Sequence, residues 1–502
     1  MLPASLSNMT RSTPSLPVIR RLSDDFSIER VFSHFASRAG CLWFDSVPKS
    51  TSPVDVDVPP PRYSFLMSDP IATLVANVGD PDPWPVLQQW YRQLPSTQAA
   101  NLPPMQGGIA GLIGYEAATW LEQVGVSQRN DLPTPAISLG LYDWTIAMDH
   151  AEGTSWLICQ GFSDEACFGT EQDRLERDRL EQDRLEQDRL GRATVRADEI
   201  EAQIQTMLET PSEATPLDDH VSPCDRERVT SNFSSQEFRA AVADVVNRIR
   251  SGDSFQVNLA QRLLHPAVLS SADLYRRLRV ANPAPYSVFY HGDPFDVLSS
   301  SPELFLKLDG RNVQTRPIKG TVPRTGDAGE DQRLAESLQR SLKDRAENIM
   351  IVDLMRNDLS RVCRDDSVEV RKLCQVERYQ FVQHLVSIVE GTLRDDCNVI
   401  DLLKACFPGG SVTGAPKIEA MRTIAELEPD RRGPYCGSMG YISCSGHAEF
   451  NILIRTVTAT GGQWQIPVGG GITARSNPES EEAETWTKAE GILRALPSSQ
   501  QD

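Results

Sequence analysis

Residues 316–324 read Arg-Pro-Ile-Lys-Gly-Thr-Val-Pro-Arg, and this segment separates two kinds of sequence in the second half of the chain. Strand-like runs at 286–290 and 297–301 precede it, and a long helical segment at 333–358 follows it. Strands that come first and are followed by a long helical segment predict an α+β fold. The two prolines stiffen the segment and Gly320 permits unusual backbone dihedrals, so we expect a constrained loop.

One lysine, Lys319, stands at the centre of this expected loop. A single lysine in a loop is most often a solvated charge. At an ordinary pKa near 10.4, roughly one such amine in two thousand is neutral at pH 7, so a nucleophilic lysine needs burial or cationic neighbours that lower its pKa. Arg316 and Arg324 are such neighbours in the sequence. We expect a reactive amine if they lower the pKa of Lys319, and a solvated charge if they point away.

Regular patterns of helices and strands fill the stretch from 229 to 497. We expect helices at 236–250 and 272–279, a strand at 255–263 and a final helix near 479–496. This stretch is predicted to form one α+β domain.

The first part of the chain is poorer in helices. We expect a disordered lead-in at 1–20 and a mostly β N-terminal subdomain at 21–165. A glycine-rich run at 107–115 predicts a strand or a tightly packed turn, because its spacing does not match a nucleotide-binding loop. The other elements that we expect are a short helix at 27–39 and strands at 41–44, 62–67, 137–148 and 155–160.

A low-complexity repeat separates the two parts. Between residues 171 and 190 the unit Glu-Gln-Asp-Arg-Leu occurs four times, with Arg177 as one variant. Five residues turn a helix by about 140° beyond one full turn, so the leucines spiral around the surface and form no stripe. We predict an exposed charged helix or a mobile insertion, within a charged insertion and linker at 166–228.

The 502-residue chain is acidic, with a formal net charge of −19 and a pI near 4.9. Nucleic acids and anionic membranes bind clustered Lys and Arg, so we expect neither as a partner. A small anionic substrate would require local positive charge or a metal ion. The ten cysteines are scattered, and no apolar run has the length of a signal peptide or a membrane span, so we expect reduced thiols and a cytoplasmic protein.

Two groups of carboxylates have helical spacing. Asp344 and Glu347 share one face of the long helical segment, and Glu481, Glu484 and Lys488 share one face of the last helix. Either group alone is most often a solvated helix face. Together they could supply the few carboxylates of a Mg²⁺ site, with the other metal positions left for water and a substrate carboxylate.

Two glycine-rich segments could add backbone donors. Residues 407–417, Phe-Pro-Gly-Gly-Ser-Val-Thr-Gly-Ala-Pro-Lys, run into a helix and place Thr413 and Lys417 at its positive end. Residues 468–472 predict a second turn, which follows Arg455 on the preceding strand. A substrate with two carboxylates could be held by the metal and by Arg455 with these amides.

Six segments together resemble the chorismate-utilising enzymes in their order and spacing. The resemblance is strong over 234–496, and 106–115 and 139–149 extend it weakly into the first half. The six segments are Ser-Pro-Glu-Leu-Phe at 301–305, Pro-Ile-Lys-Gly-Thr at 317–321, Ile-Val-Asp-Leu-Met-Arg-Asn-Asp at 351–358, and the segments 409–417, 435–441 and 469–471.

This resemblance implies the fold of the family, which has two antiparallel β-sheets packed face to face with helices outside. It also makes 229–497 the chorismate-binding catalytic domain. The subdomain at 21–165 would be similar to the N-terminal domain of anthranilate synthase component I.

Two positions separate the branches of the family. Members that add water to chorismate carry a lysine where this chain has Gln256, and an uncharged amide is no general base. Members that form anthranilate typically carry alanine at the position of Lys319, whereas members that form aminodeoxychorismate have lysine in a similar loop. The resemblance therefore implies conversion of chorismate and ammonia to 4-amino-4-deoxychorismate through a covalent lysine adduct, for the p-aminobenzoate moiety of folate. Anthranilate formation for tryptophan synthesis, and a non-catalytic tryptophan- or chorismate-binding protein, remain alternatives.

The resemblance also implies roles for single residues. Lys319 would attack C2 of the chorismate ring, and Glu303 would protonate the departing 4-hydroxyl. A histidine packed in the core is the alternative interpretation of His384. Mg²⁺ would be held by Glu347 and Glu484, with Asp344 and Glu481 close by. The residues that match positions around the substrate are Thr413, Tyr435, Arg455, Gly469, Gly471, Lys488 and His384.

The resemblance also predicts partners. No segment is similar to a glutaminase with its cysteine nucleophile, so ammonia is expected from a separate glutaminase subunit, as a heterodimer, or from solution. The relatives hold a tryptophan in the N-terminal domain, but Trp-Phe-Asp-Ser at 43–46 departs from the Leu-Leu-Glu-Ser of feedback-inhibited relatives. L-Tryptophan is therefore a further candidate ligand, and the matching positions are Ser46, Arg62, Tyr63, Pro285, Tyr286 and Ser287.

Overall fold

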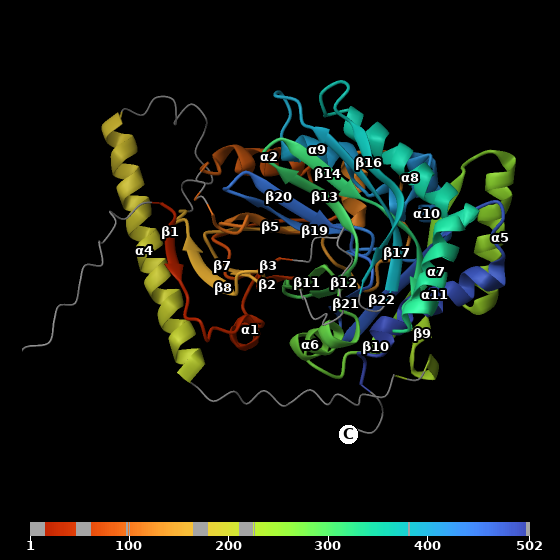
Figure 1. The fold of residues 1–502 in the computed structure, drawn as a ribbon, viewed down its shortest axis with the longest axis horizontal. Helices are drawn as coiled ribbons and strands as arrows, with labels where there is room; N and C mark the ends of the chain where they lie inside the picture. Colours follow the sequence, from red (N-terminus) through yellow and green to blue (C-terminus); the bar gives the residue numbers. More distant parts are fainter. Residues whose placement is uncertain are drawn as a thin grey trace, which may run out of the picture.

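Two β-sheets lie at the centre of the computed structural model, and helices surround them (Figure 1). The structure describes residues 16–46, 62–96, 99, 101–163, 179–209, 224, 226–379 and 382–497. The strand pairs of both sheets are antiparallel. In the part of the chain that is described, no helix combines the length and the apolar character needed to cross a lipid bilayer.

The larger sheet has twelve strands. In spatial order they are β1 (Val18–Arg21), β8 (Thr154–Cys159), β7 (Trp144–Asp149), β3 (Tyr63–Met67), β2 (Leu42–Asp45), β11 (Tyr286–His291), β12 (Asp296–Ser301), β21 (Thr456–Thr460), β22 (Gln463–Ile472), β10 (Gln256–Pro266) and β18 (Gly414–Ala415), with β9 (Thr230–Ser231) beside β10.

The second sheet has ten strands. In spatial order they are β15 (Ile318–Pro323), β17 (Val382–Thr392), β14 (Asn312–Arg316), β13 (Leu304–Asp309), β20 (His447–Asn451), β19 (Ser438–Ser443), β5 (Gly108–Ile113), β6 (Ile137–Tyr142) and β4 (Ala72–Ala76), with β16 (Glu369–Arg378) beside β17.

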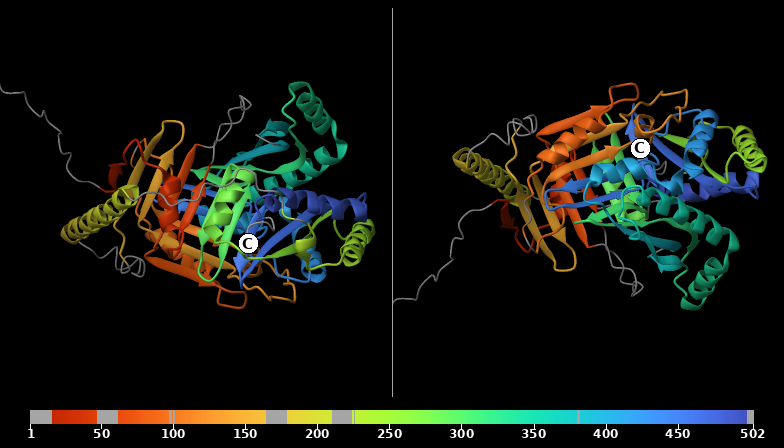
Figure 2. Two further views of the ribbon diagram at one scale, coloured as in Figure 1. Left: turned by 90° about the horizontal axis from the view of Figure 1, so that it is seen from below. Right: turned by 90° about the horizontal axis from the view of Figure 1, so that it is seen from above.

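The helices lie outside the two sheets (Figures 1 and 2). They are α1 (Ile28–Phe35), α2 (Trp84–Gln93), α4 (Arg179–Glu209), α5 (Ser235–Ser251), α6 (Ser271–Ala281), α7 (Ala328–Arg340), α8 (Leu342–Ser360), α9 (Val399–Cys406), α10 (Lys417–Leu427) and α11 (Pro478–Leu493). Short 3₁₀ turns occur at η1 (Tyr115–Trp120), η3 (Arg226–Arg228) and η4 (Gly410–Val412).

The sheets pack face to face through one apolar layer. Phe65 and Val288 of the larger sheet share this layer with Leu112 and Tyr441 of the smaller one. The ring of Tyr441 lies 5.5 Å, centroid to centroid, from the rings of both Phe44 and Phe65. The predicted α+β fold of two antiparallel sheets with outer helices is therefore confirmed.

Both sheets contain strands from both halves of the sequence. In the larger sheet β2 pairs with β11, and in the smaller sheet β5 pairs with β19. The expected division at residues 165 and 229 therefore does not separate one sheet from the other. The run at 107–115 contains the buried strand β5, where Gly108 has a φ of 142° and a Cβ would lie 2.2 Å from the carbonyl oxygen of Ile442.

Helix α4 lies within the stretch that we expected to be an insertion and linker. Its buried residues Ala193, Ala197, Ile200 and Ile204 follow helical spacing and pack beside β1 and β8. Residues 164–178 and 210–223, which include the start of the repeat, lie outside the described part. The expected lead-in also lies outside it up to residue 15, and its last residues form β1 where we expected disorder.

Three other local expectations differ from the structure. Residues 318–323 form the strand β15 and no loop, because an edge strand tolerates proline at its ends. Residues 469–471 lie in β22 and form no turn. The single helix expected at 333–358 is two helices, since Ser341 ends α7 and its hydroxyl accepts a hydrogen bond from the Asp344 N–H at the start of α8.

Candidate active site

Lys319 lies on β15, where the pairing with β17 is irregular. The register shifts between Ile318 and Thr321, and Gly320 has a φ of 82° within this shift. The Lys319 side chain is partly buried, and its Nζ donates a hydrogen bond to the Ser411 carbonyl oxygen at 2.8 Å. Burial and, to a smaller extent, the positive charge of Lys488 hold the pKa of Lys319 below its usual range, although Glu347 and Glu303 act to raise it. Lys319 is therefore not a solvated loop lysine.

The two arginines beside this segment do not activate the lysine. Arg316 forms an ion pair with the buried Glu377 at 2.6 Å, and Arg324 forms one with the buried Asp331 at 3.1 Å. Neither guanidinium is among the groups that shift the pKa of Lys319. The sequence left open whether these arginines lower the pKa of Lys319 or point away, and they do not lower it, because each charge is neutralised by its own carboxylate.

Glu303 lies in the turn between β12 and β13 and is 4% exposed. Its backbone is fixed on both sides, since its N–H donates to Ser301 Oγ at 3.2 Å and its carbonyl accepts from the Ile452 N–H at 3.0 Å. Burial raises the pKa of Glu303 to about 7, against the opposing effects of hydrogen bonds from Ser411 and Ile318 and the charge of Lys319. Ser411 thus contacts both groups, and Glu303 holds a proton up to neutral pH, as a general acid requires.

Helices α8 and α11 bring the two predicted acidic faces together. The ammonium of Lys343 lies 3.9 Å from Glu347 Oε1 and 4.0 Å from Glu481 Oε1. On α11 the ammonium of Lys488 lies 2.8 Å from Glu484 Oε1 and donates to the Gly469 carbonyl oxygen at 2.8 Å. The spacing of the carboxylates in the sequence therefore predicted a real cluster.

Burial and charge act differently on these groups. Burial raises the pKa of Glu347 and of Glu481. Burial also acts to raise the pKa of Glu484, but the ion pair with Lys488 brings it below its ordinary value. For Lys343, burial acts to lower the pKa, but the carboxylates of Glu347, Glu481, Glu484 and Asp344 raise it above the usual range.

The donors in this cluster suit Mg²⁺. Within the described residues no three His, Cys, Asp or Glu side chains stand close enough to form a ready-made metal cage. Mg²⁺ is usually bound by only one or two carboxylates, together with water and substrate oxygens, so it needs no such cage. Glu347 Oε1 is buried and has no hydrogen-bond partner, which leaves an oxygen available to a cation.

Two further predicted substrate contacts are His384, on the strand that pairs with β15, and Arg455, whose charge acts on His384. His384 lies opposite Thr321 in the sheet, and its Nδ1 lies 2.9 Å from Thr321 Oγ1. Burial, and then the charge of Arg455, lower the pKa of His384 to about 3, so its imidazole is neutral. Arg455 has a φ of 53°, and among the described residues its guanidinium forms no ion pair or hydrogen bond. A half-buried cation without a partner, on a strained backbone, is suited to an anionic ligand.

The remaining predicted contacts lie on the two glycine-rich segments and in the core. Thr413 Oγ1 donates to the Gly409 carbonyl oxygen at 3.1 Å, and Tyr435 is buried. At Gly471 a Cβ would lie 1.9 Å from Gln256 Nε2, so only glycine leaves room for that amide. Lys417, which we expected beside a ligand, instead pairs with Asp358 at 2.7 Å and has a structural role.

A small pocket, with a cavity volume of about 30 Å³, lies between the two sheets. Arg62 does not line it, because Arg62 pairs with Asp149 at 2.8 Å. The other five positions that we matched to a tryptophan site, Ser46, Tyr63, Pro285, Tyr286 and Ser287, line this pocket together with Phe44, Asp45, Phe65, Met439, Tyr441, Glu449 and Asn451.

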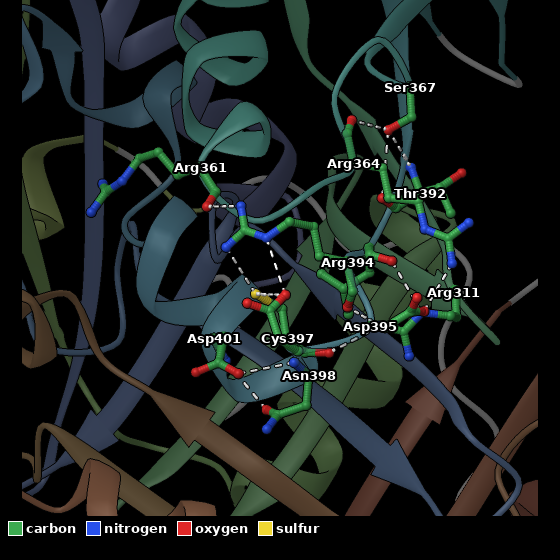
Figure 3. Close-up of polar contacts among 12 residues, drawn as sticks. Arg311, Arg361, Arg364, Ser367, Thr392, Arg394, Asp395, Cys397, Asn398 and Asp401 are labelled. Carbon is green, nitrogen blue, oxygen red and sulfur yellow. Dashed lines mark hydrogen bonds and ion pairs between the residues drawn. The ribbon is translucent and has the colours of Figure 1, made fainter.

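A cluster of arginines follows the C-terminal end of α8, opposite to the end that carries Glu347 (Figure 3). Figure 3 shows Arg394 beside the Arg361 carbonyl oxygen, to which it donates at 2.8 Å. Arg364 pairs with Asp395 at 2.8 Å, and Arg311 donates to the Leu393 carbonyl oxygen at 3.0 Å. These arginines have structural partners, so we assign no ligand-binding site to them.

Sequence reasoning missed two residues of the site. Ser411 lies within the quoted segment 407–417 but received no role, because its contacts with Lys319 and Glu303 come from distant strands. Lys343 precedes Glu347 by four residues, which is the spacing of neighbours on a helix face, and that spacing could have identified it.

Comparison with known proteins places these features in a family. The family model described as chorismate binding enzyme matches residues 44–494. The chain is 38% identical over 454 residues to aminodeoxychorismate synthase component 1 of Salmonella typhimurium. That alignment covers 87% of this chain and 90% of the other protein. The chain is also 38% identical over 465 residues to anthranilate synthase component 1 of Synechocystis sp., covering 87% and 88%. The solved structure of anthranilate synthase component I from Streptococcus pneumoniae matches with a TM-score of 0.71 and 30% identity, over 89% of this chain and 95% of that one.

Proposed function

This chain belongs to the chorismate binding enzyme family, and from that premise we propose that it converts chorismate and ammonia to 4-amino-4-deoxychorismate. Relatives named aminodeoxychorismate synthase component 1 support this activity, at 38% identity from Salmonella typhimurium and 36% from Escherichia coli. The observation that carries the proposal is the placement of Lys319 and Glu303 around Ser411, with a lysine pKa that is lowered and a carboxyl pKa that is raised. The product would supply the p-aminobenzoate moiety of folate.

The first chemical step would join Lys319 to the substrate. The neutral amine of Lys319 attacks C2 of the chorismate ring, both ring double bonds shift by one position, and the bond from C4 to its hydroxyl breaks. Glu303 gives its proton to the departing oxygen, so that water leaves and Glu303 becomes a carboxylate. The enolpyruvyl group stays attached throughout.

The second step would release the lysine. Ammonia attacks C4, both ring double bonds shift back to their original positions, and the bond between C2 and Lys319 breaks. The amine returns as the leaving group, and the proton lost by the incoming nitrogen restores Glu303. One water leaves and one ammonia enters, so the lysine and the acid are both regenerated.

The surrounding residues would bind and orient the substrate. Arg455 has no carboxylate partner among the described residues and would take one substrate carboxylate. Glu347 and Glu484 would hold Mg²⁺, with Asp344 and Glu481 close by, and the bound ion would withdraw charge from the ring carboxylate. Tyr435, Thr413, His384, Gly469, Gly471 and Lys488 would line the pocket around the ring.

Two partners belong to this proposal. A separate glutaminase subunit would supply the ammonia, since the relatives are named as a first component of their enzymes. L-Tryptophan would occupy the pocket between the sheets, whose aromatic walls include Tyr63, Phe65 and Tyr441 and whose cavity of about 30 Å³ would have to widen to admit the indole ring. Titration calorimetry with L-tryptophan, on the wild type and on Ser287→Trp, tests this, because the larger side chain should fill the pocket and abolish any binding.

Product analysis tests the proposed reaction. The protein is incubated with chorismate, Mg²⁺ and an ammonium salt, and the products are separated by chromatography with mass detection. We expect 4-amino-4-deoxychorismate, with its enolpyruvyl group intact. Direct appearance of fluorescent anthranilate together with free pyruvate would overturn the proposal.

A second candidate function is anthranilate formation for tryptophan synthesis. It is favoured by relatives named anthranilate synthase component 1, which are as similar in sequence as the others. The same product analysis separates the two activities. A third interpretation, a non-catalytic tryptophan- or chorismate-binding protein, would require that no product forms even with saturating ammonium.

A further inference from the structure

Lys343 occupies an unusual position among the carboxylates of the site. Its ammonium lies between helices α8 and α11, 3.9 Å from Glu347 Oε1 and 4.0 Å from Glu481 Oε1. The negative charges of Glu484 and Asp344 also favour the charged form of Lys343. The four carboxylates proposed to bind or adjoin a metal are thus the same four that surround this one lysine.

The contacts of Lys343 are electrostatic and loose. Both distances exceed the range of an N–H···O hydrogen bond, and Glu347 Oε1 has no hydrogen-bond partner. The Lys343 side chain is 56% exposed, so it can turn outward without disturbing the packing. Lys488 differs, because it is held by two short contacts to Glu484 and to the Gly469 carbonyl oxygen.

We propose that Lys343 is a built-in counter-cation, which neutralises this carboxylate cluster until a divalent cation displaces it and which thereby sets the affinity of the site for metal. Glu347 and Glu481 both face Lys343, and an ammonium between two carboxylates offsets their mutual repulsion. A divalent cation does the same more strongly and binds the oxygens directly. The two cations compete for one volume, so each must weaken the binding of the other.

The expected change in metal affinity follows from the loss of the Lys343 charge. Removing one positive charge a few ångströms from the metal position should strengthen metal binding by about tenfold, since the site is partly exposed and screened by solvent. The inference rests on the metal site of the proposed function but needs no turnover to be tested. It also predicts that the metal-free protein is less stable without this lysine.

Binding of Mn²⁺ alone to the full-length protein provides the test. The probe is Mn²⁺, which takes the same oxygen ligands as Mg²⁺ and whose free form is counted by electron paramagnetic resonance. We expect Lys343→Met to lower the dissociation constant about tenfold relative to the wild type. Lys343→Arg, which keeps the charge, should stay within about twofold of the wild type. The matched control is Lys404→Met, which removes the same charge from an exposed position on α9.

A thermal scan gives an independent readout. The metal-free Lys343→Met protein should melt below the wild type, and Mn²⁺ should raise its melting temperature more than that of the wild type. Unchanged or weaker Mn²⁺ binding in Lys343→Met, or an equal gain in Lys404→Met, would overturn the role of Lys343. The variant Glu347→Gln separates the two proposals: Mn²⁺ binding that survives in Glu347→Gln overturns the metal site itself and this inference with it. Binding that is lost in Glu347→Gln but unchanged in Lys343→Met overturns the inference alone.

Discussion

Burial has opposite consequences for the two reactive residues of the site. It removes water from both, and water favours the charged form of any group. The pKa of the Lys319 amine therefore falls while the pKa of the Glu303 carboxyl rises to about 7. One environment thus favours a neutral nucleophile and a protonated acid at the same pH, which is the combination that the proposed first step requires.

Glu303 makes both the reaction and the stability of the protein depend on pH. Its carboxyl loses its proton above about pH 7, so the turnover number should fall there, and Glu303→Gln should lower it by about 10²- to 10⁴-fold and remove that fall. The folded-state pKa lies above the ordinary value of 4.5, so wild-type stability decreases as pH rises from 4.5 to 7. At pH 8 Glu303→Gln should be more stable than the wild type, by roughly 3 kcal/mol.

Turnover and urea unfolding, each measured at pH 5 and at pH 8, check both effects. The variant should gain stability relative to the wild type only at the higher pH. A wild-type turnover number that stays constant up to pH 9 would contradict the assignment of Glu303 as the acid.

At this scale the sequence indicated the residues that we propose to be reactive, but not their surroundings. Lys319 and Glu303 stand in segments whose order is typical of the family, so both could be named. The effect of Arg316 stayed open because its partner, Glu377, lies on a strand that reaches it only in the folded protein. Sequence distance shows which charges are close along the chain, but it does not show which carboxylate neutralises each of them.

At the scale of elements, β15 is the main difference between expectation and structure. Pro317, Gly320 and Pro323 predicted a loop, since proline and glycine are rare inside strands. Because β15 lies at the edge of its sheet, one side of the strand needs no partner and the prolines are tolerated. The helix α11 was predicted correctly, and the residues of α8 were predicted to be helical but continuous with α7, since helical spacing reveals a shared face but not the break at Ser341.

Gly320 determines how close β15 lies to α8. A Cβ at this position would lie 2.8 Å from Leu338 Cδ1 and 2.9 Å from Asp344 Cγ, and φ is 82°. Gly320→Ala should therefore push β15 from α8, displace Lys319, lower the turnover number by more than about tenfold and cost more than about 2 kcal/mol of stability. Gly326→Ala is the matched control, because φ there is 85° but no atom lies within 4 Å.

Kinetics and denaturant unfolding on both variants separate strain from displacement. Gly326→Ala should cost about 1 to 2 kcal/mol, from the backbone alone, and keep its activity. Equal activity of Gly320→Ala and the wild type would show that the position of β15 is not important for Lys319.

At the scale of the whole molecule, the sheets connect the two halves of the sequence. β2 is paired with β3 on one side and β11 on the other, and β5 lies between β6 and β19. The sequence predicted strands in both halves but treated them as separate domains. Pairing between strands more than 200 residues apart leaves no local pattern, so only the resemblance to a family indicated that the sheets face each other.

This architecture predicts that the halves do not fold alone. A fragment of residues 229–497 would lose β2 and β5, leave β11 and β19 with open edges, and expose Val288 and Tyr441 of the layer between the sheets. We expect this fragment to aggregate or to unfold without a cooperative transition, whereas the full chain unfolds cooperatively. Circular dichroism during thermal unfolding of both proteins checks this. A sharp, reversible transition of the fragment would disprove the shared architecture.

The central claim is that Lys319 forms a covalent bond to the substrate. The most direct measurement is the intact mass of the protein after incubation with chorismate and Mg²⁺ in the absence of ammonia, for the wild type and for Lys319→Ala. Without ammonia the second step cannot occur, so we predict that the wild type gains the mass of chorismate less one water and that Lys319→Ala gains none. An adduct of the same mass on Lys319→Ala, or a wild type that forms product with ammonia yet never shows the adduct, would contradict the claim.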